Sequence, residues 1–550
     1  MTALREKLQP LIRGEVYDDE KRLREASHDA SLFEVKPQLV VAPYDSEDLK
    51  ALVRFANENP GISLTARSGA TDMSGGPLNE SVILDFTKHF NQVREVGDSP
   101  RSSSVEAGGY AVTQPGVFYR DFEKRTLEKG WLMPSYPASR EICTVGGMVA
   151  NNAGGEKTFS YGQTKDYVDK LKVVLADGNE YELKPLNKSE LETKISQGDF
   201  EGNLYQELFQ LLEENYDIIK QHKPRVSKNS AGYFLWDVWD RNTFDITKLF
   251  TGSQGTLGLI SKITFRLIKP KPHSKLLVIF LHDLKPLGSI ADAVVECEPE
   301  SFESYDDKTL KLALRFLPDF ISYLGKNLIT LAIDFLPEFW MFLTGGMPRL
   351  VLMAEFTGDT EDEVDEKLQR AQKAIKPFKL KHRITTSEED AKKYWTIRRE
   401  SFNLLRKHIK GKRTAPFIDD MVVKPEYLPD FLPKLEELLK PYNLTYSVAG
   451  HVGDGNFHII PLITIGDPKI KEIIPELSKK VYDLVLQFHG SITGEHNDGL
   501  IRTPFLKQMY GEQIYALFER VKKLFDPKNI FNPGKKTGGS FEYAMKHVQG

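Results

Sequence analysis

Arg67-Ser68-Gly69-Ala70-Thr71-Asp72-Met73-Ser74-Gly75-Gly76 follows directly on a strand-like run at residues 62–66. Glycines and small residues placed after a strand allow backbone N–H groups to converge on an anion, typically a phosphate. The stretch lacks the lysine of the P-loop and the regular glycine spacing of the nicotinamide fingerprint. We therefore interpret it as an anion-binding loop of another kind, with a simple glycine-rich turn as the alternative.

Alternating strand and helix patterns surround this loop. Residues 39–41 form a short apolar run typical of a strand, and residues 46–56 carry apolar side chains at helical spacing. Before them, residues 1–36 are rich in charge and place Leu4 and Leu8 at helical spacing, which predicts a helical arm. The N-terminal half of the chain is thus expected to mix helices and strands.

Two further glycine-rich stretches follow the first. Residues 144–155 contain glycine pairs at 146–147 and 154–155, and residues 250–260 lead into a strand-like run at 262–267. With so little side-chain volume, the backbone can lie close against a large, flat group. Three such loops in one region are difficult to explain by turns alone, and they suit a long, extended cofactor.

A histidine motif dominates the C-terminal half. The stretch Ala449-Gly450-His451-Val452-Gly453-Asp454-Gly455-Asn456-Phe457-His458 places two histidines on either side of a glycine-containing loop, and Glu495-His496 follows about forty residues later. Imidazole and carboxylate groups are ligands of divalent zinc-like or manganese-like ions, and three protein ligands leave a coordination position open. The alternative is that both histidines are ordinary residues at strand ends.

Composition limits the functional classes. The chain has 550 residues, which suggests two or three domains, and its formal net charge of -4 argues against a nucleic-acid binder. Only two cysteines occur, so neither a disulfide framework nor a cysteine-ligated cluster is expected. The charged N-terminus lacks the apolar run of a signal peptide. These features favour a reducing, cytoplasmic setting.

The glycine-rich loops, with the step Tyr161-Gly162 to Asp166-Tyr167-Val168 between them, occur in the order found in one flavoprotein family. The chain resembles the vanillyl-alcohol-oxidase, or PCMH-type, FAD-binding flavoproteins, and among them the FAD-linked D-lactate, glycolate and D-2-hydroxyglutarate dehydrogenases. The resemblance covers residues 37–270 and 350–535. It implies an α+β fold, in which a PCMH-type FAD-binding domain of two α+β subdomains precedes an α+β, ferredoxin-like substrate domain of the FAD-linked oxidase type.

The resemblance and a composition shift after Pro270-Lys271-Pro272 predict the domain limits. We expect the N-terminal helical arm at 1–36, the FAD-binding domain at 37–270, the substrate domain at 271–520 and a tail at 521–550 that returns to the FAD-binding domain. An apolar insertion at 316–345 is interrupted by charges and falls short of a membrane-spanning helix. It either caps the active site with packed helices or forms a peripheral membrane-binding patch.

In the resembling family, the first loop holds the FAD pyrophosphate and the later loops line the rest of the flavin. The residues carried over are Arg67, Ser68, Gly69, Ala70, Thr71, Asp72, Ser74, Gly75, Pro137, Thr144, Gly146, Gly147, Asn151, Asn152, Gly154, Gly155, Tyr161, Gly255, Gly258, Ile260 and Asn532. Ser68 and Ala70 replace commoner glycines, and Gln254 stands where the family often has glutamate. Because no histidine lies within 67–76, we expect FAD to be bound non-covalently.

The resemblance also implies catalytic roles. In the related dehydrogenases, two histidines and the glutamate of a later Glu-His pair bind a divalent metal, and the histidine of that pair is the base. Carried over, His451, His458 and Glu495 would bind zinc or manganese, and His496 would be the base. Asn456 would lie near the substrate hydroxyl. The variant sequence after His496 resembles a subgroup whose longer members carry iron–sulfur ligands in a C-terminal extension.

An arginine in a Trp-x-x-Arg segment commonly holds the substrate carboxylate in this family. Arg398 is the match, with Arg399 as the alternative register. A guanidinium group can bind a carboxylate through two parallel hydrogen bonds. Arg502 is a second candidate for the carboxylate, with an ordinary surface arginine as the alternative. Related dehydrogenases add a lysine some fifteen residues later, and residues 415–420 offer no counterpart.

The expected reaction is FAD-dependent, metal-assisted oxidation of a small D-2-hydroxy acid to the 2-oxo acid, with hydride passing to flavin N5. The electron acceptor would be a separate molecule: a quinone, an electron-transfer protein or a cytochrome. The alternatives are an oxygen-using FAD oxidase, an enzyme like alkyl-dihydroxyacetone-phosphate synthase, and a noncatalytic flavin electron-transfer subunit. A cytoplasmic protein is expected, with peripheral contact at the inner face of the membrane and a homodimer both left open.

Overall fold

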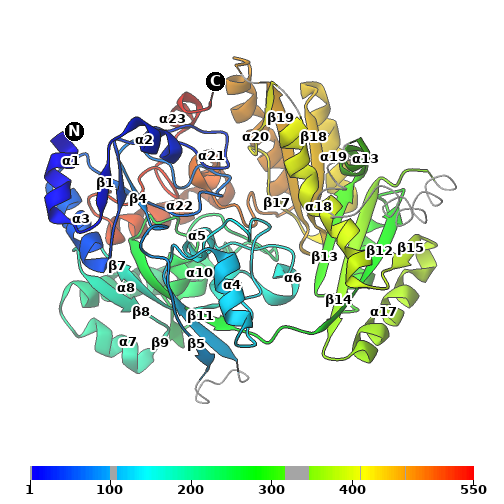
Figure 1. The fold of residues 1–550 in the computed structure, drawn as a ribbon, viewed down its shortest axis with the longest axis horizontal. Coiled ribbons are helices and arrows are strands. Elements are labelled where there is room, and N and C mark those ends of the chain that lie inside the picture. The colour runs from blue at the N-terminus through cyan, green and yellow to red at the C-terminus, as the bar shows by residue number, and fades with distance from the viewer. Residues whose placement is uncertain (1–2, 100–107, 316–345, 409–410, 465, 550) are drawn as a thin grey trace.

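The computed structural model describes residues 3–99, 108–315, 346–408, 411–464 and 466–549 (Figure 1). The first lobe of the chain begins with a four-stranded sheet. Its strand order is β1-β2-β4-β3, with β2 and β3 parallel to β4 and β1 antiparallel at the edge. The strands are β1 (Glu15–Tyr17), β2 (Leu39–Ala42), β3 (Leu64–Arg67) and β4 (Val82–Asp85). The expected strand at 39–41 is thus confirmed.

Helix α3 (Ser46–Glu58) connects β2 to β3 and covers this sheet. It begins at Ser46 because the side chain of Asp45 accepts hydrogen bonds from the N–H groups of Glu47 and Asp48, which caps the helix. The N-terminal arm is only partly helical, which corrects the expectation for 1–36. Between α1 (Ala3–Leu8) and α2 (Glu20–Ala26), the buried side chain of Val16 lies on the edge strand β1.

A five-stranded antiparallel sheet forms the second half of the first lobe, in the order β5-β6-β11-β7-β8. Along β11, buried and half-buried residues alternate, which is the period expected of a strand with one face in the core. Its strands are β5 (Val93–Asp98), β6 (Gly109–Thr113), β7 (Val168–Val174), β8 (Glu180–Leu183) and β11 (Leu259–Leu267). Its main helices are α4 (Tyr119–Leu127), α5 (Val145–Asn151) and α8 (Phe200–Glu214). The first lobe therefore has the two α+β halves that the resemblance implied.

The second lobe is built on one sheet of eight strands (Figure 1). Its first half runs strand, helix, two strands, helix, strand, and its spatial order β15-β12-β14-β13 is that of a ferredoxin-like unit. The elements are β12 (His273–Leu281), α12 (Leu287–Val295), β13 (Ser301–Asp306), β14 (Leu350–Gly358), α17 (Glu361–Ile375) and β15 (Lys381–Ile384).

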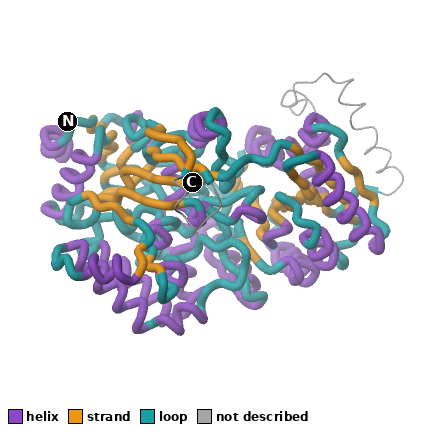
Figure 2. Tube along the Cα trace, turned by 90° about the horizontal axis from the view of Figure 1, so that it is seen from below, coloured by secondary structure: helices purple, strands orange, loops and turns teal. Residues whose placement is uncertain are grey.

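A second half continues the same sheet, because β18 pairs with β13. Helix α18 (Glu388–His408) links the two halves. The remaining elements are β16 (Lys412–Thr414), β17 (Met421–Val422), α19 (Leu428–Leu439), β18 (Thr445–His451), β19 (Asn456–Thr464) and α20 (Ile470–Gln487). Figure 2 shows both lobes from below, with helices flanking the strands in each.

The C-terminal helices return to the first lobe. This return starts earlier than the expected residue 521: the N–H of Ser230 donates to the carbonyl of Thr493, and the N–H of Leu500 donates to that of Ser74. The apolar face of α22 (Leu506–Phe525) stabilises this contact, since Phe518 packs edge-on against Tyr233 of the first lobe. The C-terminal helices are α21 (Gly499–Arg502), α22 (Leu506–Phe525) and α23 (Phe541–Lys546).

Smaller elements complete the lobes: β9 (Leu186–Asn187), β10 (Thr243–Phe244), α6 (Thr158–Tyr161), α7 (Lys188–Ile195), α9 (Tyr216–Gln221), α10 (Leu235–Val238), α11 (Thr247–Phe250) and α13 (Asp307–Arg315). The predicted apolar insertion at 316–345 lies outside the described residues. Among the helices that are described, none combines the length and the apolar character needed to cross a membrane.

Candidate active site

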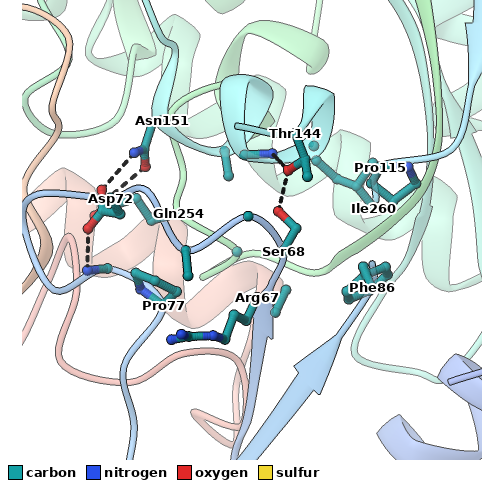
Figure 3. Close-up of a pocket in the computed structure, with 18 of the residues that line it drawn as sticks. Arg67, Ser68, Asp72, Pro77, Phe86, Pro115, Thr144, Asn151, Gln254 and Ile260 are labelled. Atoms are coloured by element: carbon teal, nitrogen blue, oxygen red, sulfur yellow. Dashed lines mark hydrogen bonds between the residues drawn. The ribbon is translucent and has the colours of Figure 1, made fainter. Parts of the chain in front are cut away.

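A pocket lies where the three glycine-rich loops of the first lobe meet (Figure 3). The loop after β3, the first turns of α5 and the loop before β11 each form one side of it. Its lining is Ala66, Arg67, Ser68, Gly69, Ala70, Thr71, Asp72, Gly76, Pro77, Phe86, Pro115, Thr144, Gly146, Gly147, Ala150, Asn151, Gln254, Gly255, Gly258 and Ile260. Loops far apart in the sequence thus enclose one space.

Asp72 shapes the first of these loops. One of its carboxylate oxygens accepts the N–H groups of Ser74 at 3.0 Å and Gly76 at 2.7 Å, while the other accepts the side-chain amide of Asn151 at 2.7 Å. Gln254 joins the third loop to this arrangement, since its amide nitrogen lies 3.2 Å from the Ser74 hydroxyl. Side chains therefore fix the backbone of the loop and tie it to its neighbours.

The glycines of the pocket fit an extended ligand because they let the loops approach closely. A Cβ atom on Gly69 would lie 2.7 Å from the carbonyl oxygen of Ile142, and one on Gly146 would lie 2.6 Å from that of Pro115. Gly255, at φ 68°, would instead direct a side chain toward the pocket, since its Cβ would meet only Ala66, at 3.7 Å. A group as large as FAD has space here only if these positions remain small.

Several residues predicted to contact FAD lie behind the lining or beyond it: Ser74, Gly75, Pro137, Asn152, Gly154, Gly155, Tyr161 and Asn532. Asn532 donates to the carbonyls of Gly76 and Gln254 and so ties two loops together. The guanidinium of Arg67 donates to the carbonyls of Ala26 and His28 in the N-terminal segment. Direct contact of all the predicted residues with FAD stays a prediction.

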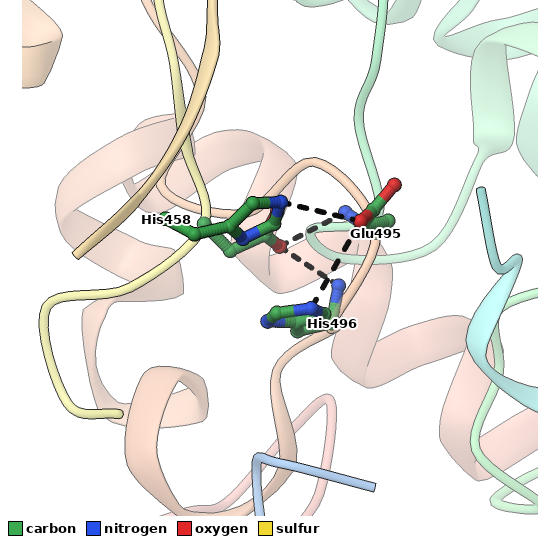
Figure 4. A group of neighbouring side chains, drawn as sticks. His458, Glu495 and His496 are labelled. Carbon is green, nitrogen blue, oxygen red and sulfur yellow. Dashed lines mark hydrogen bonds and ion pairs between the residues drawn. The ribbon is translucent and has the colours of Figure 1, made fainter. Parts of the chain in front are cut away.

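The histidine cluster lies at the end of the β18–β19 hairpin. Figure 4 shows His458, Glu495 and His496 of this cluster. Nε2 of His451 and Nε2 of His458 lie 3.3 Å and 3.4 Å from the same oxygen, Oε1 of Glu495. The loop between the strands requires Gly455, because it adopts φ 65° and a Cβ there would overlap the carbonyl of Val423. Two imidazoles and one carboxylate thus converge as the motif predicted.

Carboxylates hold the far sides of these rings. Nδ1 of His451 lies 2.5 Å from Oε1 of Glu303, and Nδ1 of His458 lies 3.3 Å from Oδ1 of Asp419. An ionised carboxylate accepts the proton on Nδ1, so a metal that displaced the proton on Nε2 would find that nitrogen of each ring facing inward, the arrangement that metal-binding histidines commonly show. The geometry therefore fits a divalent ion between His451, His458 and Glu495.

Asp420 lies in the same group, with ligand atoms of Asp420, His458, Glu495 and His496 all within 4.8 Å of one another. Its Oδ2 already accepts the N–H groups of Glu495 at 2.9 Å and His496 at 2.8 Å, and its Oδ1 accepts the amide of Asn456 at 3.0 Å. We assign Asp420 to holding the Glu495-His496 turn, since its oxygens have their donors.

The other oxygen of Glu495 faces a buried lysine. Nζ of Lys228 lies 3.2 Å from Oε2 of Glu495 and 3.3 Å from Oδ2 of Asp454, and the lysine side chain is fully buried. Burial lowers the pKa of Lys228, but Glu495 and Asp454 outweigh it, and the net shift is upward. A permanent positive charge therefore balances two of the carboxylates in this interior.

The cluster stabilises positive charge. Burial alone would lower the pKa of His458, but Asp419 and Glu495 outweigh it and raise the pKa to about 10. The pKa of His496 is likewise raised, against its burial, by Asp420 and Asp419. Carboxylates that raise the pKa of neighbouring imidazoles also attract a metal cation, so the donor set fits a divalent ion on charge as well as on geometry.

The cluster lies directly against the glycine-rich loops of the first lobe. A Cβ atom on Gly154 would be 3.0 Å from Oε2 of Glu495. The side-chain amide of Asn497 donates to the carbonyls of Asn151 at 3.1 Å and Gly252 at 3.0 Å. The two lobes therefore bring the predicted metal ligands to the loops of the predicted flavin site.

Comparison with known proteins agrees with this pairing of lobes. The FAD binding domain matches residues 37–184, and the C-terminal domain of FAD linked oxidases matches residues 271–536. The chain belongs to the FAD-linked oxidase family. Its first lobe is therefore an FAD-binding domain, and the pocket of glycine-rich loops is its candidate flavin site.

Two curated relatives align along most of the chain. It is 27% identical over 536 residues to the D-2-hydroxyglutarate dehydrogenase of Pantoea ananatis, which covers 95% of this chain and 50% of that protein. The chain thus spans about half the length of that relative. It is 28% identical over 501 residues to the D-lactate dehydrogenase of Archaeoglobus fulgidus, which covers 90% of each.

A solved structure shares the fold. The crystal structure of p-cresol methylhydroxylase with substrate bound superposes with a TM-score of 0.68 at 17% identity, covering 97% of this chain and 96% of that chain. At this identity the likeness shows the fold alone.

The arginines predicted to contact the substrate take different positions in the structure. Arg398 is mostly buried and pairs with Glu303, whereas Arg399, the alternative register, is half exposed and pairs with Glu156. Arg502 is fully buried rather than on the surface, and its guanidinium donates to the carbonyls of Asn497 and Asp419. This position suits support of the site better than contact with a substrate.

His496 and Asn456 lie beside the proposed metal ligands, and their predicted roles stay predictions. Nδ1 of His496 is 2.8 Å from Oδ2 of Asp419, its Nε2 is 4.0 Å from Oε1 of Glu495, and its ring stacks on that of His458. The amide nitrogen of Asn456 is bound to Asp420, and its amide oxygen is buried without a hydrogen-bond donor. These contacts leave Nε2 of His496 and the oxygen of Asn456 available to a ligand.

Sequence reasoning missed Glu303, Asp419 and Lys228. Asp419 lies in the segment 415–420, for which the resemblance implies only a lysine, while Glu303 and Lys228 lie in segments without a recognisable motif. A cation also stands fifteen residues after Arg398, because Arg413 occupies that place in β16. Its side chain donates to the carbonyl of Leu32 and to Gln549, so it ties the two ends of the chain together.

Proposed function

We propose that this protein is a dehydrogenase that oxidises a small D-2-hydroxy acid of the lactate, glycolate or 2-hydroxyglutarate type to the 2-oxo acid. The observation that carries the proposal is the convergence of His451, His458 and Glu495, with His496 beside them, against the loops of the flavin lobe. The names of the curated relatives favour the same substrate class.

His451, His458 and Glu495 would hold a divalent ion, zinc or manganese, and the pocket of glycine-rich loops would hold FAD non-covalently. When bound, the ion would acidify the substrate hydroxyl and FAD would accept the hydride from the α-carbon. An electron-transfer protein, a quinone or a cytochrome would then take the electrons. The proposal needs both groups, because the side chains of the cluster have no redox chemistry of their own.

The side chains of this chain bind and orient the substrate and take its proton. Arg398 would bind the carboxylate, because a guanidinium group offers two parallel hydrogen bonds that fix orientation as well as charge. His496 would take the hydroxyl proton at Nε2, since Asp419 already engages Nδ1. Asp419 would stabilise the imidazolium that results.

The test is flavin reduction under anaerobic conditions. The purified holoprotein is mixed with D- and L-lactate, glycolate and D- and L-2-hydroxyglutarate, and loss of the oxidised-flavin absorbance is followed. We expect the D-acids alone among the chiral pairs to reduce the flavin, and a chelator to abolish the reaction until a divalent ion is restored. Reduction by none of them would favour a noncatalytic flavin carrier, and turnover unaffected by the chelator would remove the metal from the mechanism.

A further inference from the structure

Glu303 occupies an unusual position between two predicted functional groups. It lies in β13, at the centre of the sheet of the second lobe, and its side chain is 1% exposed. One carboxylate oxygen is 2.5 Å from Nδ1 of His451, and the other is 3.1 Å from both Nε and Nη2 of Arg398. A single buried carboxylate therefore touches a proposed metal ligand and the proposed substrate arginine.

Sheet pairing explains how these residues meet. Ser304 on β13 lies opposite Gly450 on β18, which places Glu303 beside His451 one residue further on. Arg398 reaches the same carboxylate from α18. Neither contact depends on a mobile surface side chain, because all three groups are mostly or fully buried.

The hydrogen bonds leave one edge of Arg398 unused. Glu303 engages Nε and one N–H of Nη2, and among the described residues the remaining N–H groups have no acceptor. Those groups form the outer edge of the guanidinium, which can accept a carboxylate in a forked geometry. Glu303 thus determines which edge of Arg398 is presented to a ligand.

We propose that Glu303 is a positioning residue that couples binding of the metal ion to binding of the substrate carboxylate; this rests on the function proposed above. It orients His451 through Nδ1 and Arg398 through Nε and Nη2, while touching neither ion nor substrate. A change in the hydrogen bonds between Arg398 and the Glu303 carboxylate changes how strongly that carboxylate interacts with His451. Binding of the substrate carboxylate and binding of the metal ion therefore affect each other.

The first experiment replaces Glu303 with glutamine, which keeps the size and a hydrogen-bond acceptor but removes the charge. Ion affinity is measured by chelator competition on the flavin-loaded protein without substrate, with zinc and manganese as probes. Binding of pyruvate and 2-oxoglutarate to the metal-free protein is measured by perturbation of the flavin spectrum. We expect E303Q to weaken ion binding about 10- to 100-fold and also to weaken 2-oxo acid binding.

Glu156→Gln is the matched control. Glu156 pairs with the neighbouring arginine of α18, Arg399, at 2.6 Å, so the substitution removes a similar ion pair without touching His451. We expect its ion affinity to equal that of the unaltered protein. Flavin content and melting temperature, measured for both variants, show whether the fold is retained.

A double-mutant cycle keeps the proposal testable if E303Q folds poorly. Arg398→Lys preserves the positive charge but loses the forked hold on Glu303, so we expect it to change ion affinity about threefold or more in the natural background and much less in the E303Q background. An equal effect in both backgrounds, or E303Q with unaltered ion affinity, would overturn the proposal. A natural protein that takes up neither zinc nor manganese would instead refute the metal role proposed above.

Discussion

The flavin pocket and the histidine cluster lie in contact but are built from different kinds of chemical group. Glycines, small side chains and backbone groups line the pocket, and contiguous loops supply them. The cluster consists of buried charged side chains, and each depends on a partner from another element, as His451 does on Glu303 and Glu495 does on Lys228. The two regions should therefore tolerate different substitutions. The pocket should be sensitive to added side-chain volume, and the cluster should be sensitive to the loss of a charge.

The largest effect should come from the proton acceptor of the cluster. Replacing His496 with alanine should lower the rate of flavin reduction about 10²- to 10⁴-fold, because a positioned general base contributes that much. Flavin content should be unchanged, since His496 does not line the flavin pocket. Stopped-flow absorbance measures the rate, with His282→Ala, at an exposed histidine, as the control. A variant that lost its flavin as well would show that the two regions are not separable.

The second prediction concerns the contribution of the buried Lys228 to the stability of the cluster. Lys228→Met should reduce the free energy of unfolding of the metal-free protein by about 3–5 kcal/mol, because Glu495 and Asp454 lose their buried cation. Denaturant unfolding monitors the loss. The exposed pair Lys480–Glu476 supplies the control, since Lys480→Met should leave the free energy of unfolding nearly unchanged.

A divalent ion should recover part of that loss. It would neutralise Glu495 from the other oxygen, so adding zinc or manganese to the Lys228→Met protein should raise its unfolding midpoint more than it does in the natural protein. An equal loss for both lysine variants would mean that the charges of the cluster are not desolvated as the distances suggest.

The same contrast explains what the sequence could predict. The pocket loops were found because each is a contiguous run placed after or before a strand, and His451, His458, Glu495 and His496 were found because they form two short motifs. Glu303 stands within an ordinary strand pattern and Lys228 within a loop. Their roles depend on pairing between β13 and β18 and on contact between the lobes, which no local pattern records.

Two predicted element boundaries differ from those in the structure for a related reason. The run Glu15–Tyr17 is a strand because β2 lies beside it, although its flanks are helical. Contact of the C-terminal segment with the first lobe begins near Thr493, where the N–H of Ser230 donates to the Thr493 carbonyl, well before residue 521. In both cases a tertiary contact determined the structure and the local sequence did not.

Added volume should affect the pocket alone. Gly147→Leu should weaken flavin binding about 10- to 100-fold, the equivalent of the 1–3 kcal/mol that overpacking typically costs. A Cβ there already lies 3.2 Å from the Thr144 hydroxyl and 3.5 Å from that of Ser68, so a larger side chain must extend into the pocket. Flavin content after gel filtration measures the effect. Ion uptake should be unchanged, and its loss would contradict the separation of the two regions.

The smallest expected effect concerns backbone strain in the first loop. Ala70 adopts φ 55°, a left-handed conformation that costs a residue with a side chain about 1–2 kcal/mol. Glycine removes that cost but loses about 0.5–1 kcal/mol through the greater freedom of the unfolded chain. Ala70→Gly should therefore stabilise the protein by up to about 1 kcal/mol. Ala66→Gly, four residues earlier in β3, relieves no strain, carries the entropic loss and removes a packed methyl group, so it should destabilise the protein. Melting temperatures of the two variants should shift in opposite directions, and a shared direction would show that the loop conformation is not strained.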